Sequence, residues 1–187
     1  MKRFVSLLFL GVALIACPSL THAQITWDGN SDGDGDDVSW SDPNNWDTDT
    51  VPTSSDVARI TVDDTVQISG ADQTVDSLYV NASNARIKIG AGLTLVTNAG
   101  YEQEGGTLAG DGTLTVQGQL HWTGGTMTGT GTTTAGGGFE MGFVTLDRRR
   151  LVLPSGEHGR VFGFDDPTGQ NGAVIEVQSN AVFEIQN

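Results

Sequence analysis

Residues 105–116, GGTLAGDGTLTV, and residues 124–135, GGTMTGTGTTTA, are two copies of one pattern, offset by 19 positions. Their glycine and threonine positions coincide. Glycine suits tight corners because it adopts backbone angles that other residues avoid. Threonine favours the strands between those corners. A fixed offset near twenty residues therefore predicts short β-strands that stack coil upon coil.

The same offset arranges the apolar residues into three columns. They are Ile89, Leu108, Met127 and Leu146; Leu95, Leu114, Thr133 and Val152; and Tyr101, Leu120 and Phe139. Stacked coils bury such columns in a continuous core that no single coil could bury. We therefore predict an all-β fold, a right-handed parallel β-helix. An antiparallel β-sandwich is the alternative, but it gives no reason for a fixed offset.

The first residues have the pattern of an export signal. Lys2 and Arg3 precede an apolar run over residues 4–16, and Ala23 ends a small-x-small cleavage pattern. We predict a signal peptide over residues 1–23 and an extracellular or cell-surface protein. The alternative is a lipobox over residues 14–17, which would lipidate Cys17 and anchor the protein in the cell envelope. The run is too short for a transmembrane helix, so no membrane span is expected in the mature chain.

Charge and cysteine content limit the classes of partner. The formal net charge is −14, which disfavours nucleic acids and anionic membranes and favours cations. Cys17 is the only cysteine, so no intrachain disulfide is expected.

We divide the mature chain into a Trp- and Asp-rich cap over residues 24–56 and β-helix coils over residues 57–187. The last residues, 182–187, alternate like a strand with no polar cap after them. Because an open coil exposes unpaired strand edges, we expect these coils to continue into missing downstream coils or to pair with a partner.

Several segments resemble the start of secreted bacterial autotransporter-like β-strand-repeat proteins. They are TWDG at 26–29, WSDPNNW at 40–46, VP at 51–52, DVARI at 56–60 and LHWTGGTMTGTG at 120–131. The resemblance covers nearly the whole mature chain and implies a β-helix at the cell surface. It implies no catalytic residues.

The acidic stretch 28–37, DGNSDGDGDD, fits the first half of a calcium-binding loop. Alternating oxygen-bearing side chains separated by glycine can wrap that ion. The candidate ligands are Asp28, Asn30, Asp32, Asp34 and Asp36. Ser39 or Ser41 stands where an EF-hand has its bidentate glutamate, so a solvated acidic loop is the favoured interpretation.

Aromatic side chains near the start suggest a second candidate site. Trp40 and Trp46 could form a platform on which sugar rings stack, and a buried cap over the core, shared with Trp27, is the favoured alternative.

The basic cluster at 148–150 raises the question of catalysis. Polysaccharide lyases on β-helices combine basic residues with carboxylates on one face, and Asp147, Arg149, Arg160, Asp165 and Asp166 could be fitted to that scheme. Consecutive residues point in different directions, so an exposed corner is the favoured interpretation.

Together these patterns favour a structural or adhesive β-helix without catalytic activity, which binds glycans or other surface proteins. A carbohydrate-active enzyme and a calcium-stabilised surface module are the alternatives.

Overall fold

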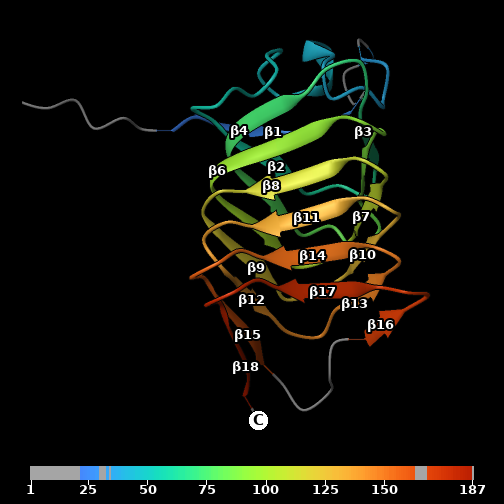
Figure 1. Ribbon diagram of the computed structural model, residues 1–187. Helices are drawn as coiled ribbons and strands as arrows, with labels where there is room; N and C mark the ends of the chain where they lie inside the picture. The colour runs from blue at the N-terminus through green and yellow to red at the C-terminus, as the bar shows by residue number, and fades with distance from the viewer. Residues whose placement is uncertain (1–21, 30–32, 34, 163–167, 187) are drawn as a thin grey trace, which may run out of the picture.

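The computed structural model describes residues 22–29, 33, 35–162 and 168–186. Over these ranges the chain winds into a β-solenoid of about six coils, and every pairing between named strands is parallel (Figure 1). In Figure 1 the coils descend from the N-terminal end while the near strands point to the left, which is the right-handed sense. The predicted parallel β-helix is therefore confirmed, and the β-sandwich alternative is wrong.

The solenoid has three faces. Face 1 contains one strand from each coil: β3 (Thr65–Ile68), β5 (Arg86–Ile89), β7 (Thr107–Gly110), β10 (Thr126–Thr128), β13 (Thr145–Asp147) and β16 (Thr168–Gln170). Face 2 contains the first parts of β4 (Gln73–Val80) and β6 (Thr94–Gln103), then β8 (Thr113–Val116), β11 (Thr132–Ala135), β14 (Arg150–Leu153) and β17 (Val174–Val177). Face 3 contains β1 (Gln24–Thr26), β2 (Val57–Ile60), the last parts of β4 and β6, then β9 (Gln119–Trp122), β12 (Phe139–Met141), β15 (His158–Phe162) and β18 (Val182–Gln186).

The predicted columns lie in the interior of the middle coils. Leu108, Met127 and Leu146 are paired neighbours on face 1, and Tyr101, Leu120 and Phe139 are paired neighbours on face 3. On face 2 the expected stack of Leu95, Leu114 and Thr133 is also present. Since these side chains are buried, the offset of 19 describes the middle coils correctly.

Two members of the predicted columns are wrong because corner lengths differ between coils. Ile87, not Ile89, pairs with Leu108, since the corner after β5 has four residues where the corner after β7 has two. Leu151, not Val152, pairs with Thr133, since the corner after β13 is one residue shorter than the corner after β10.

The N-terminal segment packs onto the first coil. Strand β1 pairs with β2, and a short 3-10 helix, η1 (Pro43–Asn45), begins after Asp42, whose side chain accepts a hydrogen bond from the Asn44 amide. Trp27, Trp40 and Trp46 are fully buried and belong to the same apolar cluster as the coils. The stretch over residues 35–46 is joined to the coils by backbone hydrogen bonds: the Trp40 amide donates to the Gln67 carbonyl, and the Gln67 amide donates to the Val38 carbonyl.

At the opposite end, the last described coil leaves apolar residues uncovered. Ile175 and Val177 of β17 and Phe183 and Ile185 of β18 follow the inward-facing positions of the preceding coil, yet they are 36–60% exposed. No helix in the described ranges is long and apolar enough to span a membrane.

Arg149 lies inside the solenoid at the corner between β13 and β14. Its Nε donates to Thr133 Oγ1 at 2.8 Å, and its terminal nitrogens donate to four backbone carbonyls at 3.1–3.4 Å; the carbonyls are those of Gly110, Gly112, Thr128 and Thr132. Burial lowers the pKa of Arg149 to about 10, which leaves it charged at neutral pH. The exposed-corner interpretation holds for Arg148 and Arg150 and is wrong for Arg149.

Carboxylates on the corners join successive coils and predict acid sensitivity. Asp111 accepts hydrogen bonds from the amide and hydroxyl of Thr130, and Asp63 accepts two from Asn84. These bonds lower the pKa of both carboxyls below the usual value of 3.8. Because the unfolded chain then binds more protons, stability should be constant above pH about 5 and fall as the pH drops further.

Thermal unfolding followed by circular dichroism from about pH 6 to about pH 2 would measure this loss. Asp63→Asn should make the unfolding midpoint less sensitive to acid, whereas a midpoint that rises on acidification would contradict the assignment. The Asp49 carboxylate forms no hydrogen bond or ion pair with the described residues, so Asp49→Asn is the control variant.

Candidate functional site

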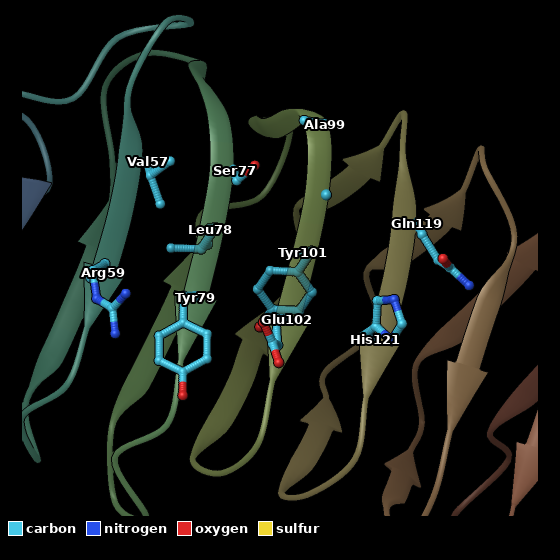
Figure 2. Close-up of a pocket in the computed structure, with 11 residues that line it drawn as sticks. Val57, Arg59, Ser77, Leu78, Tyr79, Ala99, Tyr101, Glu102, Gln119 and His121 are labelled. Carbon is cyan, nitrogen blue, oxygen red and sulfur yellow. The ribbon is translucent and has the colours of Figure 1, made fainter. Parts of the chain in front are cut away.

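The outward side of face 3 carries a groove. A cavity of about 630 Å³ extends across β2, β4, β6 and β9 near the N-terminal end of the solenoid (Figure 2). A second cavity of about 270 Å³ lies farther along the same face and shares Gln119 with the first. The two cavities therefore mark one groove that follows the solenoid axis.

Strand register arranges the lining of this groove in two rows. The charged row contains Arg59, Tyr79, Glu102, His121, Glu140, Arg160 and Glu184, one residue from each successive strand. The neutral row, two residues earlier in each strand, contains Val57, Ser77, Gly100 and Gln119. Because neighbouring strands lie about 4.8 Å apart, each row presents one side chain per coil at that spacing. Figure 2 shows the first four members of the charged row, Arg59, Tyr79, Glu102 and His121, beside Val57, Ser77 and Gln119 of the neutral row.

At the N-terminal end of the charged row, Arg59 stacks on an aromatic ring. Its guanidinium carbon lies 4.6 Å from the centroid of the Tyr79 ring. The Tyr79 hydroxyl donates to Glu104 at 2.5 Å, and this hydrogen bond raises the pKa of Tyr79. The ring is thus anchored at its far end, and it holds the guanidinium beside the cavity.

In the C-terminal part of the charged row, the ionisable side chains contact one another. His121 Nδ1 lies 3.4 Å from a carboxylate oxygen of Glu140. Arg160 lies 4.0 Å from Glu140 and 3.7 Å from Glu184. In contrast, Arg59 forms no ion pair with the residues that the structure describes. Among the described residues, Arg59 is therefore an unpaired positive charge that a ligand in the larger cavity could meet, and Glu102 is an unpaired negative charge in the same lining.

The small side chains of the neutral row leave the space that forms the larger cavity. Ser77 and Gly100 are small, so the surface between Arg59 and Gln119 is hollowed, while Leu78 and Tyr101 behind them belong to the core. A Cβ atom at Gly100 would lie 3.2 Å from the Gln119 carbonyl oxygen, which leaves little tolerance for a larger residue there.

The predicted sugar platform is not at the surface. Trp40 and Trp46 are fully buried, and their rings meet edge to face at 4.9 Å. Trp46 also contacts Trp27 at 5.2 Å and donates its indole N–H to the Trp40 carbonyl. This corrects the stacking interpretation, because neither ring has a face that a sugar could reach.

The predicted calcium ligands are only partly described. Asn30, Asp32 and Asp34 lie outside the described residues. Asp36 Oδ1 accepts hydrogen bonds from the amides of Val38 and Ser39 and from the Asn45 side chain. Hydrogen bonding by the Ser39 side chain, together with these bonds, holds the pKa of Asp36 far below its usual value. Among the described residues, no three His, Cys, Asp or Glu side chains gather as a metal site would require. Cys17, the candidate lipidation site, also lies outside the described residues.

The residues fitted to a lyase do not converge. Asp147 faces outward on face 1, Arg160 lies on face 3, and Arg149 is inside the core. Asp165 and Asp166 lie outside the described ranges. Asp147 instead accepts hydrogen bonds from Thr128 and Asn171, which lower its pKa.

Sequence reasoning missed the charged row for a simple reason. Its members are separated by 20, 23, 19, 19, 20 and 24 residues, so no constant period connects them. The available signal was local: a polar residue stands between two apolar ones in segments such as Ala58-Arg59-Ile60 and Leu120-His121-Trp122.

Comparisons with known protein families, curated proteins and solved structures found no match. The groove therefore has to be interpreted from its own geometry and chemistry.

Proposed function

We propose that this protein is an exported structural or adhesive β-helix without catalytic activity, and that it binds an extended glycan chain along the groove of face 3. The observation that carries this proposal is the charged row, which repeats a polar side chain once per coil along an open groove beside the neutral row. Export through residues 1–23 and exposure at the cell surface belong to the same proposal.

The chemistry of the groove suits a carbohydrate better than other polymers. Sugars combine hydroxyl groups with apolar ring faces, and the groove offers amide, hydroxyl, carboxylate and aromatic groups together. A nucleic acid is disfavoured because the chain has a net charge of −14. A peptide strand would pair with a sheet edge, whereas this groove lies over the face of a sheet.

Filling the groove should abolish binding. Ser77 projects into the cavity from β4, so Ser77→Trp should weaken binding of a hexasaccharide at least about tenfold. Calorimetric titration with neutral and uronate-containing hexasaccharides would measure the effect. Thr115→Trp is the matched control because Thr115 faces outward from β8 on face 2.

The control variant should bind like the unaltered protein. If no hexasaccharide binds, or if Thr115→Trp weakens binding as much as Ser77→Trp, the groove is not a glycan site. Unfolding curves for both variants would separate blocked binding from lost structure.

A carbohydrate-active enzyme is the second candidate, and the charged row is the observation that favours it. Glu102 and Glu140 flank His121 on three successive strands. Two strand spacings separate their backbones by about 10 Å, near the upper end of the carboxylate separation in inverting glycosidases. Shortened oligosaccharides after incubation, absent with Glu102→Gln, would support this candidate over simple binding.

The exposed apolar residues of β17 and β18 suggest how the C-terminal end of the solenoid is covered. Their positions match a core that a further β-strand coil would cover. We propose stacking of such a coil as the way in which this end of the solenoid is completed.

A further inference from the structure

We infer that the glycan carries carboxylate groups on some of its sugars but not on every one, and that Arg59 binds one of these carboxylates. This inference rests on the proposed glycan groove and specifies its ligand class. The relevant chemistry is that of a uronic acid alternating with a neutral sugar.

The first step is that Arg59 differs from the other arginines on the outer faces. Arg148, Arg150 and Arg160 each lie within 4.0 Å of a carboxylate. Arg59 and Arg86 form no ion pair with described residues. Arg86 is exposed on face 1, whereas Arg59 is half-buried and lines the larger cavity.

The second step is that Arg59 is held ready for an anion. Stacking on Tyr79 leaves the N–H groups at the edge of the guanidinium free, and these match the two oxygens of a carboxylate. The hydrogen bond from Tyr79 to Glu104 fixes the ring below it. The Arg59 side chain therefore loses less conformational freedom on binding a carboxylate than an arginine that is not held in place.

The third step concerns the spacing of charge along the ligand. Glu102 is exposed two strands from Arg59, about 10 Å along the row, and it would repel a second carboxylate at that point. Ser77 and Gln119 of the neutral row are uncharged hydrogen-bonding groups. A polymer with a carboxylate on every sugar is also disfavoured by the net charge of −14.

The experiment compares three probes on the full chain by calorimetric titration. They are a hyaluronan hexasaccharide, which alternates uronate and neutral sugars, the same hexasaccharide after carboxyl reduction, and a galacturonate hexamer. The alternating probe should bind at least about tenfold more tightly than its reduced form and than the homopolymer. Its affinity should also fall as salt is added.

Variants then assign the effect to one residue. Arg59→Gln should remove the difference between the native and reduced hexasaccharides, whereas Arg86→Gln should leave it unchanged. Equal affinity for native and reduced forms, or an unaltered preference in Arg59→Gln, would overturn the inference and leave the glycan groove standing. Failure of every hexasaccharide to bind, neutral ones included, would overturn both.

Discussion

Replacing Arg149 with methionine is expected to lower the free energy of unfolding by about 4 kcal/mol. Methionine is similar in length and fills the site with apolar atoms, but it donates none of the five hydrogen bonds that the guanidinium makes. Four of these bonds reach backbone carbonyls on the corners of the two preceding coils. Since these bonds are buried or partly buried, water cannot fully replace the lost donor.

Urea unfolding followed by tryptophan fluorescence would measure this loss. Arg149→Lys should recover part of it, because an ammonium group keeps the charge and three donors but cannot match the planar geometry of the guanidinium. Arg148→Ala is the neighbouring control. Its side chain is exposed, and among the described residues it forms only a surface ion pair with Asp147, so a change below about 1 kcal/mol is expected.

A loss below about 1 kcal/mol for Arg149→Met would contradict this role. That outcome would show that the carbonyls find other hydrogen-bond donors without the guanidinium. It would also show that burying the Arg149 charge destabilises the fold, and that the apolar methionine side chain relieves this destabilisation.

Truncating Trp46 to alanine is expected to lower the free energy of unfolding by about 3–5 kcal/mol. The indole is fully buried between Trp27 and Trp40, with ring centroids at 5.2 and 4.9 Å. The substitution removes both edge-to-face contacts and leaves a cavity between Trp27 and Trp40. It also removes the hydrogen bond from the indole N–H to the Trp40 carbonyl.

Trp46→Phe is the matched variant, since it keeps an aromatic ring but removes the N–H donor. Trp46→Phe should lower the free energy of unfolding by about half as much as Trp46→Ala or less, because most of the stability lost in Trp46→Ala comes from buried apolar surface. Trp46→Ala should also expose the residues of β2 that face the cluster, and faster amide hydrogen exchange there would report it. An unchanged midpoint and unchanged exchange would show that this segment contributes little to the stability of the coils.

The solenoid could be predicted because its evidence is repeated along the chain. Apolar residues at alternate positions in one segment indicate a β-strand but do not distinguish one β fold from another. Three apolar columns at one offset indicate parallel strands stacked coil upon coil. The errors arose at corners. A constant offset placed Ile89 and Val152 incorrectly. The corner of residues 90–93 is two residues longer than that of residues 111–112, and the corner of residues 148–149 is one residue shorter than that of residues 129–131.

Candidate sites were predicted less well, because local composition does not say which way a side chain faces. Trp40 and Trp46 have the composition of a sugar platform and are buried. Arg149 stands in a basic run and lies in the core, since the positive φ of 57° at Arg148 turns the corner before it. The burial of the tryptophans agrees with the interpretation favoured from sequence, and the burial of Arg149 does not.

The sequence by itself determined the period, the three apolar columns of the middle coils and the parallel β-helix that they require, because periodic burial is encoded in residues close to one another along the chain. Only the tertiary structure decided where the groove lies. Arg59, Tyr79, Glu102 and His121 come from four successive strands separated by unequal numbers of residues. Strand pairing, which acts between backbones rather than between residue types, aligns these side chains in one row, so their alignment follows from register alone.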